Sequence, residues 1–473
     1  MSQDSGTFNV FTRIVGGALL LAACAHADTA KMPAADSATA SGATLRASSS
    51  SSSSSSPACT GDNGGLTLPA GFCATVFADG LGHPRHVVVA QNGDVYVNTW
   101  SGSYYQDTPK PGRGFVALLR DTTHDGRADV ITYFGETPEH GGHGGTGIAL
   151  HAGALYVEEG ATIMRYTLPA VPGAPTAAPT LILSGMPLGG DHPMHPFAID
   201  SAGQMFIDMG TASNSCQVRN RTLESPGHIP CTELQTRGGI WKYGANTTGQ
   251  TYSPKERYAT GIRNAVGIAL DGSGQLYSTQ HGRDQLAENW PKLYTPDQGQ
   301  NLPAEELLKV QEGHDYGWPF CYFDNMQQKL VLAPEYGGDG GRTVGQCSGK
   351  TEPVAFFPAH WAPDGLLFYT GSMFPAHYHG GAFIAFHGSW NRAPGPQGGY
   401  QVVFVPFANG VPSAGAGKFE TFADGFAGGI MQPDGAAHRP VGLAQGPDGA
   451  LYIADDKGGR VWRVTYAGAG AAR

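Results

Sequence analysis

A short pattern of hydrophobic and polar positions recurs along this chain. Two apolar runs flank a turn that contains Gly, Asp or Asn, and the second run carries an aromatic residue. Each copy is typical of a β-hairpin, because alternating apolar side chains cover one face of a strand and glycine permits the backbone of a tight turn. The copies span residues 86–97, 147–157, 197–207, 267–277 and 442–453, with a degenerate copy at 365–369 and 382–385.

Six hairpins predict an all-β fold, a six-bladed β-propeller of four-stranded antiparallel blades. One hairpin cannot bury its own apolar face, whereas blades arranged radially bury it against their neighbours. A β-sandwich or two separate barrels would use similar hairpins and is the alternative fold. Helices should be few, and the clearest short candidate is 303–310, which has acidic residues in its first turn. Ligands of propellers bind where loops converge at one end of the channel, so we sought the site in polar residues that flank each repeat.

The N-terminus predicts export. Arg13 precedes an apolar run, 14–23, that ends in Leu-Ala-Ala-Cys24, which is typical of a bacterial lipoprotein signal whose cysteine becomes acylated. The run is too short to span a bilayer as a helix. An ordinary cleaved signal peptide is the alternative. We expect a lipoprotein-type signal peptide at 1–24 and a periplasmic protein that a lipid on Cys24 anchors to the membrane.

Residues 25–58 are rich in Ala, Ser and Thr and include the serine run 48–56, so we expect a flexible tether ahead of a propeller domain at 59–473. The remaining cysteines form three pairs of near neighbours in sequence: Cys59 with Cys73, Cys216 with Cys231, and Cys321 with Cys347. An even number of cysteines in an exported protein favours disulfides. The net charge of −10 argues against nucleic acid as a partner.

The flanks of the hairpins carry the candidate site residues. Asp191-His192 precedes the third hairpin, and a histidine beside an acid is a usual way to supply a general base near neutral pH. Arg263-Asn264 precedes the fourth hairpin, and an arginine there can clamp a carboxylate or polarise a carbonyl. Further polar flanks are 387–392, 438–440 and 455–457. Several arginines at one mouth favour an anionic ligand such as a small tricarboxylate, although each residue taken alone is more often a solvated loop residue.

These flanks resemble the glucose/sorbosone dehydrogenases that use pyrroloquinoline quinone (PQQ), and more closely the sorbosone type than the soluble glucose dehydrogenases. The resemblance extends from about Leu68 to Tyr466. Its most specific stretches are 261–270, 312–320, 387–392 and 439–443. Members of that family are six-bladed propellers that hold the quinone at the channel mouth together with a calcium ion.

The resemblance implies a set of catalytic residues. His192 would remove the proton from a substrate hydroxyl while hydride passes to the quinone, and Asp191 would orient it. Arg263 would bind the quinone carbonyls and stabilise the negative charge that grows there, with Asn264 beside it. The expected substrate is a sugar or a sugar-derived aldehyde of the aldose or sorbosone type, and a separate electron acceptor would reoxidise the cofactor.

The resemblance also implies cofactor and metal ligands. Arg392 and Arg439 would meet the carboxylates of PQQ, and Asp456, with Asp455 as an equally close match, would line the pocket. The main-chain carbonyls of Gly282 and Arg283 would bind Ca²⁺, for which hard oxygen ligands are suited.

The chain departs from the glucose-oxidising relatives in three places. Arg283 stands where they have a proline, and Arg392 is our substitute for their pocket lysine, which has no clear counterpart here. Their glutamine near the substrate hydroxyls corresponds to the region 139–143, so glucose itself is a doubtful substrate. Glu306 and Tyr316 match positions that hold a second, structural calcium in some relatives.

Other interpretations of the same residues stay open. Residues 121–129 have oxygen ligands at loop spacing, as in a metal loop, or form a polar turn between blades. His140, His143, His192 and His195 would gather around a transition metal or are scattered loop residues. The alternative functions are a calcium-dependent propeller hydrolase of the lactonase kind, and a propeller without cofactor that binds a sugar or a protein.

Overall fold

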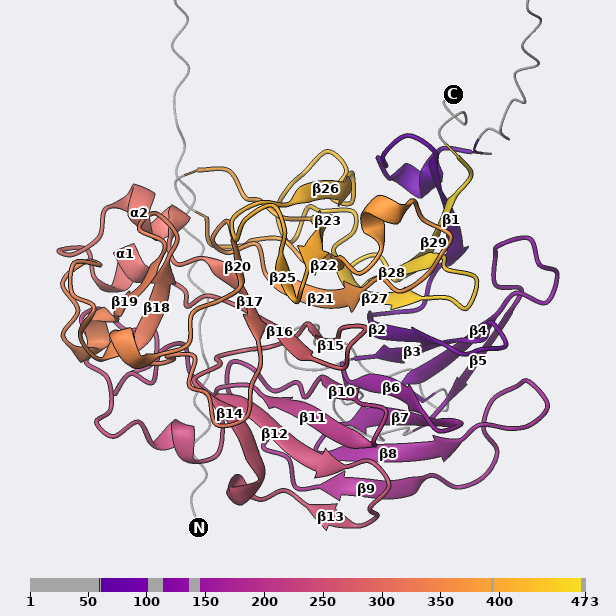
Figure 1. The fold of residues 1–473 in the computed structure, drawn as a ribbon, viewed down its shortest axis with the longest axis horizontal. Helices are drawn as coiled ribbons and strands as arrows, with labels where there is room; N and C mark the ends of the chain where they lie inside the picture. The colour runs from indigo at the N-terminus through magenta and orange to yellow at the C-terminus, as the bar shows by residue number, and fades with distance from the viewer. Residues whose placement is uncertain (1–58, 60, 101–113, 136–144, 393–394, 469–473) are drawn as a thin grey trace, which may run out of the picture. The chain divides into compact units, whose positions relative to one another are not determined.

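The computed structural model describes residues 59, 61–100, 114–135, 145–392 and 395–468. Among them, six sheets stand around a common axis, which confirms the all-β six-bladed propeller (Figure 1). The predicted signal peptide and tether lie outside the described residues, so they stay predictions. The described part of the chain begins at Cys59, the first residue of the predicted domain.

Each blade is an antiparallel sheet, and the blades follow one another along the chain. Blade 1 contains β2 (Pro84–Val89), β3 (Val95–Thr99), β4 (Val116–Arg120) and β5 (Val130–Phe134). Blade 2 contains β6 (Ile148–His151), β7 (Ala154–Glu159), β8 (Thr162–Thr167) and β9 (Thr180–Ser184), and β13 (Gln250–Thr251) adds a parallel edge strand to it. Blade 3 contains β10 (Phe197–Ile199), β11 (Gln204–Met209), β12 (Gly239–Gly244) and β14 (Arg257–Thr260).

The second half of the ring has the same plan. Blade 4 contains β15 (Ile268–Leu270), β16 (Leu276–Gln280), β17 (Glu305–Lys309) and β20 (Ala355–Phe357). Blade 5 contains β21 (Pro363–Phe368), β22 (Ala382–Phe386), β23 (Gln401–Val405) and β26 (Glu420–Ala423). Blade 6 contains β27 (Pro440–Gln445), β28 (Leu451–Asp455), β29 (Arg460–Tyr466) and β1 (Phe72–Ala78).

The predicted hairpins are the first two strands of the six blades, and the ring closes through blade 6. There β1, the first strand of the chain, pairs with β29, the last, from Phe72 opposite Tyr466 to Ala78 opposite Val461 (Figure 1). The apolar faces of blades 5 and 6 then share one core, in which Phe72, Phe383 and Trp462 are buried. Joining the two ends of the chain in one sheet leaves no open edge between the first and the last blade.

Polar side chains at the ends of second strands tie neighbouring blades together. Each is buried and bonds to the main chain of the following blade over 2.7 to 3.2 Å. They are Asn98 (to Gly147), Glu158 (to His195), Asp208 (to Ala265) and Thr279 (to Pro363). Because buried polar groups require partners, these bonds fix how adjacent blades meet at the end of the channel where the flanking loops lie.

An insertion follows β16 in the sequence, and its elements lie before and after β17. It contains α1 (Leu286–Asn289), α2 (Pro296–Asn301), the hairpin of β18 (Cys321–Asp324) and β19 (Lys329–Leu332), and the 3-10 turns η4 (Pro334–Tyr336) and η5 (Gly345–Gly349). Other short elements are η1 (Asn63–Gly65), η2 (Thr232–Gln235), η3 (Pro254–Glu256), η6 (Ala376–Tyr378) and the hairpin of β24 (Phe407–Ala408) with β25 (Val411–Pro412). No helix among the described residues is long and apolar enough to cross a membrane.

The helix predicted at 303–310 is wrong, because this stretch forms β17. Two glutamates, Glu305 and Glu306, are buried there together with Leu307 and Leu308, so the run shows no alternation of buried and exposed positions. Such a run cannot be distinguished from a buried helical segment by periodicity. The true helix lies just before it at α2, where Thr295 caps the N-terminus in a capping box and Pro296 takes the first turn.

The three predicted disulfides are confirmed. Cys59–Cys73 ties the first described residue to β1, Cys216–Cys231 closes a loop between β11 and β12, and Cys321–Cys347 joins β18 to η5. The second of these loops reaches the functional site.

Candidate active site

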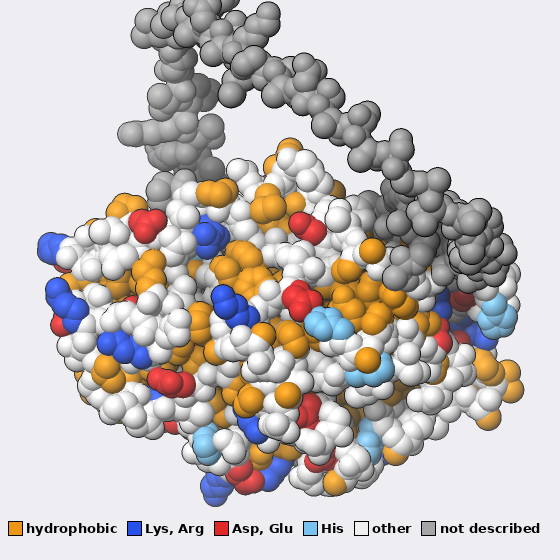
Figure 2. Space-filling view, turned by 45° about the horizontal axis from the view of Figure 1, so that its top comes forward, with side chains coloured by type: hydrophobic (Ala, Val, Ile, Leu, Met, Phe, Trp, Pro, Cys, Tyr) orange, Lys and Arg blue, Asp and Glu red, His pale blue; other side chains and the backbone are white. Residues whose placement is uncertain are grey.

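A cavity of about 640 Å³ lies where loops of several blades converge. Its size falls within the range of ligand pockets, about 300 to 1,000 Å³. The charged and polar residues that line it are Arg85, Asp191, His192, Arg221, Arg263, Asn264, His281, Asp284, Glu305, His360, Asp364, His387, Asn391, Asp434 and Arg439. On the face displayed in Figure 2, basic and acidic side chains are scattered and do not gather by charge. The cavity, by contrast, brings four arginines together in its lining.

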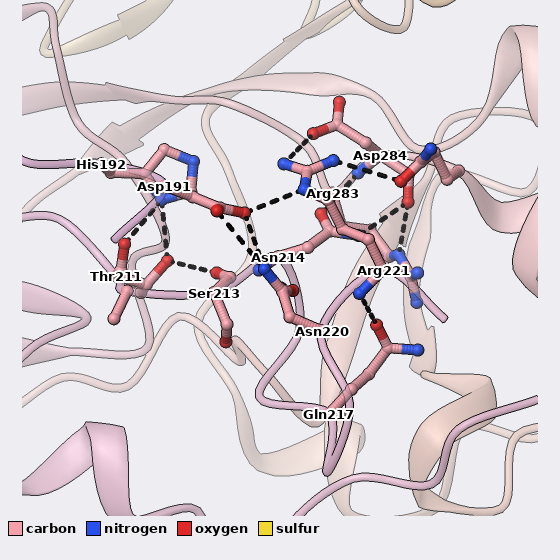
Figure 3. A network of polar contacts seen from close by, with 12 residues as sticks. Asp191, His192, Thr211, Ser213, Asn214, Gln217, Asn220, Arg221, Arg283 and Asp284 are labelled. Carbon is pink, nitrogen blue, oxygen red and sulfur yellow. Dashed lines mark hydrogen bonds and ion pairs between the residues drawn. The ribbon is translucent and has the colours of Figure 1, made fainter. Parts of the chain in front are cut away.

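His192 is held by a threonine. It is 7% exposed, and its Nδ1 lies 2.9 Å from both the carbonyl oxygen and the Oγ1 of Thr211 (Figure 3). The Thr211 hydroxyl donates to the carbonyl of Ser213, so toward the imidazole both threonine oxygens are acceptors. We therefore assign the ring proton to Nδ1, which leaves Nε2 as the basic nitrogen.

The environment of His192 favours the neutral imidazole. Burial, the positive charge of Arg263 and nearby His281 lower the pKa of His192 well below its usual value. A nitrogen base with a lowered pKa stays unprotonated at neutral pH, as a proton acceptor must be.

Asp191 does not orient His192, contrary to the prediction. Its carboxylate binds Nε of Arg221 at 2.9 Å and Nδ2 of Asn220 at 3.3 Å. The side chains of the two consecutive residues diverge, so adjacency in sequence did not imply contact in space. Thr211, which no sequence pattern had singled out, takes the predicted role of Asp191.

Arg263 and Asn264 form part of the cavity wall, as predicted. Arg263 is 3% exposed and donates to the carbonyl of Asn214 at 3.0 Å, to the carbonyl of Gly282 at 3.1 Å and to Oδ2 of Asp284 at 2.9 Å. Nδ2 of Asn264 lies 3.3 Å from Nδ1 of His281. These contacts fix the guanidinium firmly beside the imidazole of His192.

Asp284 joins three segments of the wall. Its Oδ2 accepts from both Arg263 and Arg221 at 2.9 Å, and its Oδ1 accepts from Asn391 at 2.8 Å. Burial opposes ionisation of this carboxyl, but the two guanidinium groups hold its pKa well below the usual range. Sequence patterns missed Asp284 because its partners lie in other loops.

A second charged cluster forms the opposite part of the site. Oδ1 of Asp364 lies 3.0 Å from Nε2 of His281, and Oδ2 lies 3.4 Å from Nη2 of Arg85. Burial opposes its ionisation, but His387, His281 and Arg85 hold the pKa of Asp364 well below its usual range. Burial likewise opposes protonation of His281, yet the bond to Asp364 outweighs it and raises the pKa of His281.

Asp456 stands behind this cluster rather than in the lining. It is fully buried and binds Nη1 of Arg85 at 2.5 Å and Nε2 of His387 at 2.8 Å, and both of these residues line the cavity. Asp455 instead accepts the main-chain N–H groups of Arg439 and Lys457 and binds His438. Of the two predicted candidates, Asp456 is therefore the one that supports the cavity.

Arg439 lines the cavity as predicted, and Arg392 does not. Arg439 donates to the carbonyls of His387 and Gly388 at 3.0 and 2.7 Å. Arg392 donates to the carbonyl of Ala359 at 3.1 Å and to Oδ1 of Asn301 at 3.2 Å, so it ties its loop to α2. From the same loop, Trp390 and Asn391 face the cavity, and sequence alone did not show which of three successive residues points inward.

The predicted calcium ligands, the main-chain carbonyls of Gly282 and Arg283, stay a prediction. The carbonyl of Gly282 accepts from Nη1 of Arg263, which competes with a cation for that oxygen, and the Arg283 side chain points to Glu335 at 2.5 Å. Within the described ranges, no group of three or more His, Cys, Asp or Glu residues could hold a metal ion. Glu306 is buried, which raises its pKa to about 8, and the second calcium stays a prediction.

Two other groups of residues were considered as metal ligands, the loop 121–129 and four histidines. The described members of both groups have other partners. Asp121 and Asp129 accept main-chain N–H groups in the turn between β4 and β5, which is a polar turn within blade 1 and not between blades. His195 lies 3.1 Å from Glu158 and is part of the contacts between blades. His140 and His143, with the rest of the region 139–143, lie outside the described residues.

Known proteins were compared with this chain. The family model described as TrAA12-like matches residues 66–467. An uncharacterized protein of Borreliella burgdorferi is 29% identical over 215 residues, which cover 45% of this chain and 49% of that protein. A pyrroloquinoline quinone-dependent pyranose dehydrogenase of Coprinopsis cinerea is 29% identical over 235 residues, which cover 43% of this chain and 30% of that enzyme.

Solved structures share the fold. The carbohydrate-active family AA12 protein of Trichoderma reesei, in its iodide structure, has a TM-score of 0.67 at 19% identity, covering 85% of this chain and 98% of that chain. The PQQ domain of the Coprinopsis cinerea pyranose dehydrogenase has a TM-score of 0.65 at 20% identity, covering 85% of this chain and 97% of that chain. The matches confirm the resemblance to quinone-dependent dehydrogenases, and the chain belongs to the TrAA12-like family.

Proposed function

We propose that this protein is a PQQ-dependent dehydrogenase that oxidises a sugar or a sugar-derived aldehyde of the aldose or sorbosone type. The observation that carries this proposal is a neutral imidazole, His192, in one cavity with guanidinium groups from separate blades. The family match and the quinone-dependent relative support the same chemistry.

The donor set of the cavity fits a planar ligand with several carboxylates. Arg85, Arg221, Arg263 and Arg439 come from four different segments of the ring. Among the described residues, Arg439 is the one of the four that is held by main-chain carbonyls and the ring of Tyr400 rather than by carboxylates. Its charge is therefore the least neutralised, and we assign it the main contact with a ligand carboxylate.

Bound PQQ would accept the hydride of the substrate, which carries both electrons of the oxidation. The chain supplies the base. Nε2 of His192 accepts the proton of the substrate hydroxyl, while Nδ1–H stays on the oxygens of Thr211 and keeps the ring in place. The negative charge of Asp284 favours the imidazolium that forms.

Arg263 acts through its charge. Its N–H groups already have acceptors in Asn214, Gly282 and Asp284, so few remain for a ligand. A fixed positive charge in a buried wall stabilises negative charge that develops on a carbonyl oxygen nearby, and it needs no reorganisation to do so. Because this guanidinium also binds the Gly282 carbonyl, we assign no step to a calcium ion.

Two other functions compete with this proposal. A lactonase-like hydrolase needs a calcium ion held by side-chain carboxylates in the channel, and the described residues offer no such cluster. A propeller without cofactor that only binds a sugar or a protein would keep the cavity but show no electron transfer.

One titration tests the dehydrogenase against the other two functions. The purified protein is titrated with PQQ, with and without Ca²⁺, and then tested for reduction of an artificial dye with a panel of aldoses and sorbosone-like aldehydes. Quinone binding and sugar-dependent reduction of the dye are expected. Failure to bind the quinone would exclude the dehydrogenase and leave the hydrolase and the propeller without cofactor.

We also propose the setting in which the enzyme works. The signal at 1–24 would export the chain to the periplasm, a lipid on Cys24 would anchor it to the membrane, and a separate electron acceptor would reoxidise the quinone. Mass spectrometry of the mature N-terminus tests the lipid, and a mature chain that begins after Cys24 would exclude it.

A further inference from the structure

The loop closed by the disulfide Cys216–Cys231 delivers Arg221 to the cavity. The loop leaves the propeller between β11 and β12, and both cysteines are buried. Arg221 lies in its middle and is one of the lining residues. No pattern in the sequence had singled it out.

The loop is built to hold Arg221 in one conformation. The side chain of Gln217 accepts from the Arg221 main-chain N–H at 2.9 Å, and Oγ of Ser225 accepts from that of Arg219 at 3.0 Å. The φ angle of Arg221 is 53°, in the left-handed region that residues other than glycine rarely adopt. Strain of this kind persists where the surrounding structure imposes it, and it clusters at ligand sites.

The guanidinium of Arg221 is anchored but not saturated. Nε donates to Asp191 at 2.9 Å, Nη2 to Asp284 at 2.9 Å and Nη1 to Gln285 at 3.3 Å (Figure 3). A guanidinium has five N–H groups, so two remain without an acceptor among the described residues. The side chain is 28% exposed, and a ligand that enters from solvent can reach it.

The charges around Arg221 indicate the class of ligand. Arg221 and Arg263 together balance Asp191 and Asp284, so this cluster has no net charge to attract an anion. It places N–H donors beside carboxylate acceptors, a pattern that matches the hydroxyls of a sugar, each of which both donates and accepts. Arg439, by contrast, has no carboxylate partner within the described ranges and is the better site for an anionic group.

We propose that Arg221 is a substrate-binding residue, whose free N–H groups donate to hydroxyl oxygens of a neutral sugar ring. The proposal deepens the proposed function, on which it rests. It assigns to the Cys216–Cys231 loop the recognition of one hydroxyl position, while the other arginines of the cavity serve the cofactor.

The test pairs a variant with a series of deoxy sugars. The pyranose with the highest kcat/KM among glucose, galactose and mannose is compared with its 2-, 3-, 4- and 6-deoxy analogues in the wild type and in Arg221→Ala. In the wild type, loss of the hydroxyl that Arg221 binds should lower kcat/KM about tenfold to a hundredfold, as expected for a hydrogen bond to a charged donor. In Arg221→Ala, kcat/KM for the same deoxy sugar should lie less than about twofold below that for the parent sugar. The hydrogen-bond partner of the missing hydroxyl is absent from this variant.

A merely structural role of Arg221 gives a different result. If the variant lowers kcat/KM for all sugars and keeps the full discrimination among the deoxy analogues, Arg221 only holds Asp191 and Asp284, and the proposal is overturned. A selective loss of affinity for PQQ, or a selective rise of KM for glucuronate, would show that Arg221 binds a carboxylate instead and would overturn it as well.

Two further variants keep the result interpretable. Arg219→Ala removes the same charge from an exposed position of the same loop and should leave the deoxy profile unchanged. Arg221→Gln retains N–H donors without the charge and should keep part of the discrimination if the alanine variant is unstable. If the wild type proves to oxidise no sugar, the same cycle is measured by calorimetric binding of the sugars, so failure of the dehydrogenase proposal is distinguished from failure of the Arg221 proposal.

Discussion

His192 and His281 lie in different walls of the cavity, and their pKa values are shifted in opposite directions. In the first wall, formed by His192, Thr211, Arg263, Asp284 and Arg221, the imidazole has a threonine as its partner and a lowered pKa. In the second wall, formed by Arg85, His281, Asp364, His387 and Asp456, carboxylates bind the imidazoles and the pKa of His281 is raised. The first wall is suited to take up a proton, and the second to hold fixed charge.

The contrast shows how little sequence adjacency says about a histidine. His192 follows an aspartate in the chain yet binds no carboxylate, whereas His281 and His387 receive theirs from other blades. The substitutions below test whether each wall has the chemistry that its contacts imply, from the largest expected effect to the smallest.

Removal of the base should have the largest effect. His192→Ala should lower turnover at least about a hundredfold, the usual value of a general base, because no second nitrogen in the first wall replaces Nε2. Affinity for PQQ should change little, since the imidazole is assigned to the substrate. Turnover is measured by dye reduction at saturating quinone, and a variant as fast as the wild type would refute the assignment.

Arg439 should govern cofactor affinity. Arg439→Ala removes the least neutralised guanidinium and should weaken PQQ binding about tenfold to a hundredfold, while turnover at saturating quinone falls much less. Arg392→Ala is the matched control, because Arg392 points to Ala359 and Asn301 and not into the cavity. Fluorescence titration with the quinone measures both variants, and equal losses would place Arg392 back in the site.

The partner of His192 should set the acid limb of the pH profile. Because the pKa of His192 lies well below its usual value, kcat/KM should stay on its plateau as the pH falls below about 6.5. Thr211→Asp places a carboxylate beside Nδ1, which raises the pKa of His192, so the base is lost to protonation at a higher pH. The acid limb should then move up by about one pH unit or more.

Thr211→Val is the control for that experiment. It keeps the main-chain acceptor of Nδ1 but removes Oγ1, so turnover should fall modestly while the acid limb stays near that of the wild type. An unchanged profile in Thr211→Asp would mean that another group limits the reaction at low pH.

The same shift predicts how stability depends on pH. A histidine whose pKa is lower in the folded protein binds more protons when unfolded, so His192 makes the free energy of unfolding fall as the pH drops below about 6.5. Thermal unfolding between pH 7 and 5 should show a smaller loss of Tm in a stable His192→Gln variant than in the wild type. An identical slope in both would contradict the buried, neutral state of this imidazole.

The sequence was sufficient for the parts of the fold that rest on a local pattern. The first two strands of five blades have alternating residues around a glycine turn, blade 5 has a degenerate copy of the pattern, and all six hairpins were predicted. Outer strands such as β17 were not, because burial on both faces removes the alternation that identifies a strand. The insertion after β16 has no repeat to predict it.

The site was predictable where a residue stands directly beside a hairpin. His192, Arg263 and Arg439 were found in this way, and Arg85, which precedes the first hairpin as Arg263 precedes the fourth, could have been found by the same rule. Asp284 and Asp364 were missed because their partners come from other loops of the ring. Arg221 was missed because only the closed loop, and no pattern of neighbours, brings it to the cavity.

The central claim is that one cavity holds both the electron acceptor and the base. It is tested most directly by a single-turnover experiment, in which protein loaded with PQQ is mixed with sugar without oxygen or dye and the absorbance of the bound quinone is followed. The account predicts rapid reduction in the wild type and reduction slowed at least about a hundredfold in His192→Ala at the same quinone occupancy. Equal rates in the two proteins, or a bound quinone that no sugar reduces, would contradict it.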